Sequence, residues 1–164
     1  METLATIYID SPVGVLGITA NDHAILRLWF EDDMKELSKE SLEHPILASA
    51  VQELTAYFNG SMEAFRTPLA LQGTDFQVQV WSILRDIPYG STISYGKQSQ
   101  ILGNPKSIRA VGTTNGKNPI VIMVPCHRVI GSNQDLIGFG GGLARKKWLL
   151  EHEKKHRFGV RTLF

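Results

Sequence analysis

The chain has 164 residues, of which 43% are hydrophobic and 20% charged, a composition typical of a globular protein with one ordinary domain or two small ones. No apolar run approaches the roughly 20 residues of a membrane span, and the first residues lack a secretory signal pattern, so we expect neither membrane insertion nor export. The single cysteine excludes an internal disulfide, disfavours zinc sites of the usual type and indicates a reducing compartment, the cytoplasm.

The net charge of +1 hides an asymmetry between two halves of the chain. Residues 1–84 hold 4 basic and 12 acidic side chains, a balance of −8, whereas residues 85–164 hold 13 basic and 4 acidic ones, a balance of +9. A basic half of this size favours a polyanionic partner such as nucleic acid, although two halves that pair with each other would also explain it.

Strand patterns dominate the first part of the chain. Apolar and polar residues alternate over 5–9, and turn signals separate this segment from two further strand-like segments at 15–19 and 24–30, which predicts antiparallel strands. A helix follows from Pro45 to the Asn59–Gly60 stop. Pro68 and Gly73 mark the segment after it as a linker, so we place the domain boundary near residue 70, between a domain over 1–70 and one over 71–164.

Helix signals dominate the second part. Thr74 opens a helix with a capping box, Ser94 caps a short helix through Leu102, and Asn104–Pro105 predicts the start of another that ends near Gly116. Two short helices so joined are typical of a helix-turn-helix, although many helical hairpins bind nothing. The apolar run 120–124 predicts a buried extended segment, and a last helix is expected from Leu143 to about His156.

The extended segment is followed directly by three residues that could take part in a reaction, Cys126, His127 and Arg128. A thiolate is a nucleophile, and a nearby base or cation would raise its population, but a buried structural cysteine is the alternative. Neighbours in an extended chain point to opposite sides, so His127 can act on Cys126 only through a backbone kink or a water. Glu153 is either a partner for His127 or a solvated charge.

Two further patterns are weaker evidence for a metal-binding or phosphate-binding site. His152 and His156 share a helical face without further ligands nearby, and we interpret them as surface histidines. The glycines at 138–142 lack the Lys-Ser/Thr that follows a phosphate-binding loop.

The segment 125–130, Pro-Cys-His-Arg-Val-Ile, resembles the active-site signature of the O6-alkylguanine-DNA alkyltransferases. The order and spacing of the surrounding motifs are similar to that family over about residues 74–155. These motifs are Ile93-Ser94-Tyr95, Gly103-Asn104-Pro105, Arg109-Ala110-Val111-Gly112, Asn118-Pro119, Gly141-Gly142-Leu143 and Leu149-Leu150-Glu151-His152-Glu153.

The resemblance implies an α/β (α+β) protein. Its N-terminal domain would be a ribonuclease-H-like antiparallel sheet plus helix, and its C-terminal domain a helical winged-helix or helix-turn-helix unit. It also implies a monomer that repairs double-stranded DNA from the minor groove, with the alkylated guanine, or an O4-alkylthymine, flipped out. Neither cofactor nor metal is implied, and the protein would act once, as a methylated-DNA–protein-cysteine methyltransferase.

The resemblance also implies roles for single residues. Cys126 would accept the alkyl group, His127 would activate it through a water, and Glu153 would orient His127. Asn118 would brace the turn that carries the cysteine. Tyr95 would help to rotate the base out and donate a proton to the leaving guanine.

Further residues are implied to contact DNA or the flipped base. Arg109 would fill the gap in the duplex, while small residues beside it allow close approach. Many members carry Ser where Gly140 stands, so we predict a roomier pocket. The full sets are Arg109, Tyr95, Ala110, Gly112 and Ser94 for DNA binding, and Val129, Phe139, Gly140 and Gly141 for the guanine pocket.

Three other functions are compatible with parts of this pattern. A non-catalytic lesion-binding relative would lack the acceptor, but Cys126 is present. A cysteine hydrolase would take its histidine from a distant segment rather than from the next residue. A plain helix-turn-helix regulator would need a dimer interface and leaves the Cys-His-Arg segment unexplained.

Overall fold

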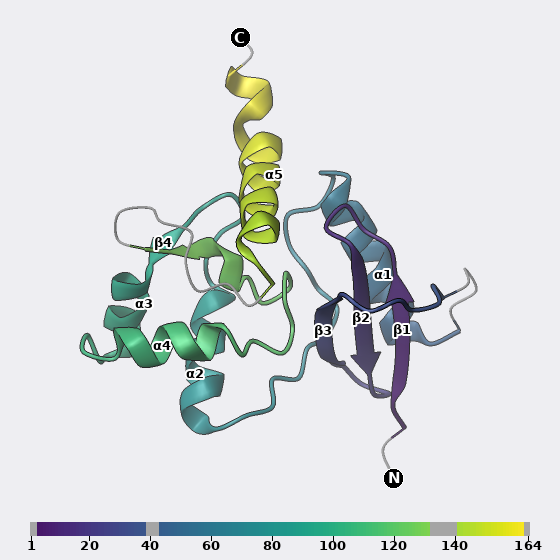
Figure 1. Ribbon diagram of the computed structural model, residues 1–164, viewed down its shortest axis with the longest axis horizontal. Helices are drawn as coiled ribbons and strands as arrows, with labels where there is room; N and C mark the ends of the chain where they lie inside the picture. The colour runs from purple at the N-terminus through teal and green to yellow at the C-terminus, as the bar shows by residue number, and fades with distance from the viewer. Residues whose placement is uncertain (1–2, 39–42, 132–140, 163–164) are drawn as a thin grey trace. The chain divides into compact units, whose positions relative to one another are not determined.

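The computed structural model describes residues 3–38, 43–131 and 141–162, with backbone alone for 158–162. The chain forms two compact units, one of residues 1–72 with 119–121 and one of residues 73–118 with 122–164. The first unit holds a sheet and one helix and the second is mainly helical, which confirms the predicted mixed α/β fold (Figure 1). No helix within the described ranges is both long and apolar enough to cross a membrane.

The first unit is a three-stranded antiparallel sheet with a helix packed on it. The strands β1 (Ala5–Ile9), β2 (Val15–Ala20) and β3 (Ile25–Glu31) follow in spatial order, and helix α1 (Pro45–Phe58) contacts β2 and β3. The sheet and helix meet through buried apolar side chains, which make this unit's core. They include Leu16, Ile18, Ile25, Leu28, Leu47, Leu54 and Tyr57.

The apolar run 120–124 differs from its prediction. Its first part is extended, since Leu28 N–H donates to Pro119 O (2.9 Å) and Val121 N–H donates to Leu28 O (3.0 Å). The chain then turns, and Ile122 has a φ of 69°. This left-handed conformation is costly for a β-branched residue, so contacts elsewhere must hold the turn.

Three helices of the second unit pack around buried polar groups. They are α2 (Asp75–Leu84), α3 (Tyr95–Leu102) and α4 (Ile108–Asn115), and the predicted capping box at Thr74 is present. Gln98 and Asn115 exchange two side-chain hydrogen bonds of 3.0 and 2.7 Å. Because each amide satisfies the other, these polar groups can stay buried between the helices.

The start of α4 was predicted wrongly. Asn104 belongs to the end of α3, where Gly103 adopts φ 91° and the Asn104 N–H donates to Ser99 O. Asn104 O then accepts from the backbone N–H and the hydroxyl of Ser107, and α4 begins only after Ser107. The residues between the two helices form a turn whose hydrogen bonds are already used, so Pro105 does not open the helix.

A short parallel ladder organises the rest of this unit. Strand β4 (Ile93–Ser94) pairs with β5 (Val129–Ile130), which follows a 3₁₀ turn η1 (Cys126–Arg128). The backbone at Cys126–His127 is therefore kinked rather than extended. Helix α5 (Leu143–Thr162) ends later than the predicted His156.

Candidate active site

Tyr95 and Cys126 are brought close together by the β4–β5 ladder. Tyr95 follows β4 directly and η1 precedes β5 directly, while the ladder pairs Ile93 with Val129. Both side chains are buried, and burial, with a further contribution from Cys126, raises the pKa of the Tyr95 phenol. The ladder therefore places the phenol and the thiol in the same buried region of this unit.

Burial dominates the electrostatics of Cys126. It raises the pKa of the thiol, while the Asn118 side chain, the Lys146 ammonium and a backbone hydrogen bond lower it by smaller amounts. The sequence left open a thiolate favoured by neighbouring charges and a buried thiol, and burial here favours the protonated resting thiol. A base is therefore needed to remove the proton when the sulfur reacts.

Asn118 also holds the turn that carries the cysteine. Its Nδ2 donates to the Val124 carbonyl (2.6 Å), and Cys126 N–H donates to the same carbonyl (2.8 Å). The strained Ile122 lies within this turn. A side chain from outside the turn thus supports a backbone conformation that the turn's own residues disfavour.

His127 and Glu153 form a buried pair. The His127 Nε2 lies 2.6 Å from the Glu153 carboxylate, and the two side chains are 0% and 1% exposed. Burial, the largest effect, lowers the pKa of His127, whereas the ionised Glu153 raises it. A neutral imidazole follows, with its proton on Nε2 facing the carboxylate. The structure therefore joins the two residues and excludes the solvated alternative for Glu153.

Arg128 contributes to this pair, whereas the sequence suggested it only as a cation near Cys126. Its Nε and Nη2 donate to the two oxygens of Glu153 at 2.8 and 3.1 Å. Together with His127 it holds the pKa of Glu153 far below its usual range. The carboxylate therefore stays ionised despite its burial.

Lys146 is a second buried cation that sequence reasoning missed. Its Nζ donates to the Val129 carbonyl (2.6 Å) and lies 5.7 Å from the centre of the Tyr95 ring. Burial lowers its pKa to about 8, and Cys126 opposes that shift. The ammonium therefore contacts the phenol and lies within electrostatic reach of the thiol.

The spacing of residues along α5 could have identified Lys146 from the sequence. Lys146, Leu149 and Glu153 are three and four residues apart, so they share one face of α5, and all three are buried. Two charged residues on the same helix face as a buried leucine indicate that these charges are paired with other groups or have a function.

The predicted DNA-contacting residues lie around α3 and α4. Ser94 caps α3 through a bond from Lys97 N–H (2.9 Å). Arg109 and Ala110 are exposed in the first turn of α4 instead of joining the buried cluster. A Cβ on Gly112 would lie 3.7 Å from the Tyr95 ring, so this glycine packs against the phenol.

The residues predicted for the guanine pocket are partly described. Val129 is fully buried, and its backbone N–H donates to Cys126 O while its carbonyl accepts from Lys146. The Gly141 carbonyl accepts from Arg145 Nη1 (3.3 Å). Phe139 and Gly140 lie outside the described residues.

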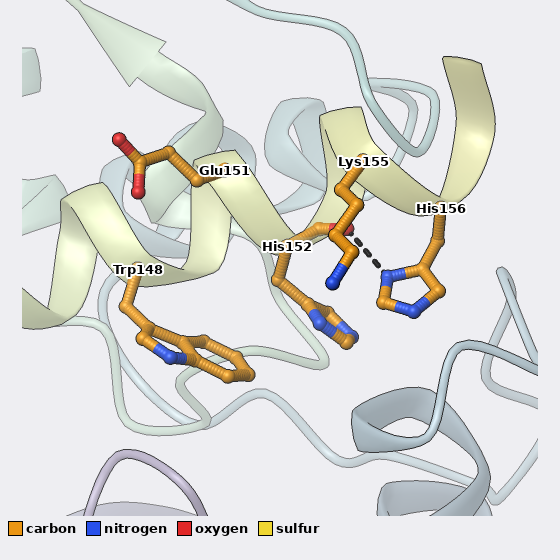
Figure 2. A pocket seen from close by; sticks show the side chains of 5 residues that line it. All are labelled: Trp148, Glu151, His152, Lys155 and His156. Atoms are coloured by element: carbon orange, nitrogen blue, oxygen red, sulfur yellow. Dashed lines mark hydrogen bonds between the residues drawn. The ribbon is translucent and has the colours of Figure 1, made fainter. Parts of the chain in front are cut away.

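A separate pocket lies along α5. Figure 2 shows its lining, Trp148, Glu151, His152, Lys155 and His156. His152 is buried and stacks on Trp148 at 4.7 Å, which corrects its interpretation as a surface histidine, and its carbonyl bonds His156 Nδ1 (2.8 Å). Within the described residues, no three or more His, Cys, Asp and Glu side chains are arranged to hold a metal ion.

A buried thiol and an imidazole–carboxylate pair, in the same unit as a helix-turn-helix, place the protein in the class of helix-turn-helix proteins that carry a cysteine–histidine–glutamate site. Family models agree with this class. Residues 4–71 match the 6-O-methylguanine DNA methyltransferase ribonuclease-like domain, and residues 75–155 match the DNA binding domain of that family. The chain belongs to the 6-O-methylguanine DNA methyltransferase family, which confirms the resemblance seen in the sequence.

Relatives and solved structures give the same family. A methylated-DNA–protein-cysteine methyltransferase of Mycolicibacterium paratuberculosis is 46% identical over 158 residues, covering 95% of this chain and 96% of the relative. One from Methanosarcina barkeri is 40% identical, covering 90% and 96%. The crystal structure of the Mycobacterium tuberculosis enzyme in complex with DNA has a TM-score of 0.82 at 44% identity and covers 91% of this chain and 92% of its own.

Proposed function

We propose that this protein repairs alkylated DNA by transferring the alkyl group from O6-alkylguanine to the sulfur of Cys126. The observation that carries the proposal is a buried thiol beside a neutral His127 that is fixed by Glu153. The new bond joins the sulfur to the alkyl carbon, and the carbon–oxygen bond to guanine breaks. Because the thioether product has no good leaving group, each molecule acts once.

His127 acts as the general base. Its Nε2 proton is held by Glu153, so Nδ1 carries the lone pair, and Nδ1 has no hydrogen-bond partner within the described residues. Nδ1 takes the thiol proton of Cys126 through one water as the sulfur attacks. Glu153 then stabilises the imidazolium that forms.

Tyr95 supplies the proton that the leaving guanine needs. Burial raises the pKa of its phenol, so the proton is retained at neutral pH until negative charge develops on the base. The proton held on His127 balances the one that Tyr95 gives up. The Lys146 ammonium, against the Tyr95 ring, favours the transient phenolate.

The protein binds double-stranded DNA as a monomer, and its helices α3 and α4 contact the minor groove. Arg109 is exposed at the start of α4 and would replace the flipped nucleotide in the stack, while Ala110 and Gly112 let the helix backbone approach closely. Ser94 would meet the DNA backbone, and Val129 with Gly140 and Gly141 would contact the flipped base. A reducing compartment, the cytoplasm, suits the free thiol.

The amount of O6-methylguanine lost per molecule of protein tests this function. A duplex with one O6-methylguanine is incubated with increasing protein, digested to nucleosides and analysed for the remaining modified base. We expect the loss to equal the amount of protein and then to stop, and Cys126→Ser to bind the duplex without any loss. A loss that continues beyond the amount of protein, or none at all, would contradict the proposal.

A further inference from the structure

Glu153 accepts more hydrogen bonds than its pairing with His127 requires. Its oxygens accept from His127 Nε2 (2.6 Å), from Arg128 Nε (2.8 Å) and Nη2 (3.1 Å), and from the Gly90 backbone N–H (3.1 Å). Arg128 also donates to the Ile87 carbonyl (2.7 Å). All three charged or titratable side chains are at least nine-tenths buried, so their charges act in a medium that screens them weakly.

The charges around His127 oppose one another. Glu153 on α5 favours the imidazolium, whereas Arg128 beside it and Lys146 on α5 disfavour it. The α2 helix also packs against η1, but its one charged residue in sequence, Asp75, is exposed at the far first turn. Burial is the largest effect and also lowers the pKa of His127, and the charge of Arg128 adds to it against the effect of Glu153.

We propose that Arg128 is a positioning residue that balances the charge of Glu153 and thereby keeps His127 neutral, with Nδ1 able to accept a proton. The inference rests on the proposed function, in which His127 is the base. Arg128 does not touch the reacting atoms. It acts through Glu153, and its fork geometry lets one guanidinium reach both carboxylate oxygens and the Ile87 carbonyl.

The proton transfer shows why this charge balance matters. As the sulfur–carbon bond forms, the thiol proton must move to His127 Nδ1 while the electrons of the carbon–oxygen bond leave with guanine. A His127 that is already an imidazolium carries protons on both nitrogens and cannot accept another. Removing the charge of Arg128 should therefore raise the pKa of His127 and confine the reaction to higher pH.

The chain provides a matched control for this variant. Arg128 anchors the segment before β4 at Ile87, and Arg157 anchors the same segment at the Tyr89 carbonyl and at Ser91 Oγ (3.0 Å). Arg157 differs from Arg128 in its exposure, since its side chain lies at the surface whereas Arg128 is buried. Because water screens an exposed charge, the loss of Arg157 should loosen the segment and change the electrostatics at His127 far less than the loss of the buried Arg128.

The experiment compares Arg128→Gln, Arg128→Met, Arg128→Lys and Arg157→Met in the full-length protein. Gln keeps a donor for the Ile87 carbonyl, Met keeps the aliphatic stem, and Lys keeps the charge. Single-turnover alkylation by an O6-methylguanine duplex is measured from pH 5 to 9, at ~1 pH unit steps or finer, and the His127 imidazole is titrated by NMR. Thermal unfolding reports whether each variant folds.

We expect the His127 pKa to be higher in the charge-free variants. The acid limb, which is the part of the pH–rate profile where the rate rises with pH, should then move to higher pH by about one unit, so that the rate at a given pH on this limb falls about tenfold. Arg128→Lys and Arg157→Met should keep the wild-type limb. An unshifted limb in a folded charge-free variant would overturn the proposal. If neither charge-free variant folds, the wild type decides, since the proposal requires its His127 pKa to lie below the ordinary 6.5, and a value above it overturns the proposal.

Failure of the underlying function gives a different result. If His127→Asn alkylates as fast as the wild type at every pH, His127 is not the base and the proposed function is wrong in that respect. If His127→Asn removes the acid limb while Arg128→Gln leaves it unchanged, the base assignment holds and the Arg128 proposal alone fails.

Discussion

Cys126 is a resting thiol rather than a preformed thiolate. Burial raises its pKa more than Asn118 and Lys146 lower it, so the uncharged form is stable between reactions. A protected thiol suits a protein that uses its cysteine once, because it limits reaction with other electrophiles. In the proposed mechanism, the proton is removed only when His127, a substrate and a water are aligned.

Lys146 should set how far burial can raise the thiol pKa. Replacing it with Met removes a cation that lowers the pKa of Cys126, so that pKa rises further and the thiolate population at neutral pH falls. We expect the rate of Cys126 alkylation by iodoacetamide at neutral pH, where Lys146 is still protonated, to fall by up to about tenfold. The exposed Lys147→Met is the control, and an equal rate in both variants would contradict this role.

Gly140 should determine which alkyl groups fit. Members with Ser at this position are implied to contact the base oxygen, so Gly140→Ser should narrow the pocket and supply that contact. We expect the rate on O6-benzylguanine to fall relative to the rate on O6-methylguanine, measured with each base in the same duplex. Unchanged relative rates would refute the predicted roomier pocket.

Among the elements, α2, α3 and α4 depend on the Gln98–Asn115 pair. Gln98→Ala leaves the buried Asn115 amide without its two partners. The expected loss of stability is about 2–4 kcal/mol, because each buried polar group left unsatisfied costs ~1–3 kcal/mol. Urea unfolding measures it, with the exposed Gln100→Ala as control, and similar unfolding of both variants would contradict the role of the pair.

Helix ends whose signals are local in sequence were predicted correctly. The Thr74 capping box, the Ser94 cap and the stop at Gly103 each depend on residues within one turn of the helix end. The predicted start of α4 was wrong because Asn104 bonds to the end of α3. An asparagine at this position could cap either helix, so the sequence does not distinguish the two.

The turn before Cys126 could not be predicted from local preferences. An isoleucine with φ 69° contradicts its intrinsic backbone preference, and the Asn118 amide that supports the turn bonds a carbonyl six residues away. The partnership of Arg128 with Glu153 likewise joins residues 25 positions apart. Such contacts depend on tertiary packing, so the sequence predicted the site's members better than its charge network.

For the whole molecule, the separation of charge predicts how it binds DNA. The second half carries a balance of +9, so binding to phosphates should release counterions and weaken steeply as salt rises. We expect log affinity to fall linearly with log salt, and Arg109→Ala to weaken binding at every salt concentration. The matched control is Arg27→Ala in the acidic half, and a salt-independent affinity would contradict the prediction.

The central claim is that Cys126 itself keeps the alkyl group. The mass of the intact protein after reaction with an O6-methylguanine duplex tests it most directly, followed by peptide mapping. We predict a gain of one methyl group per molecule, located on Cys126 and absent from Cys126→Ala. A protein that binds the lesion tightly without gaining mass, or gains the methyl group on another residue, would contradict the claim.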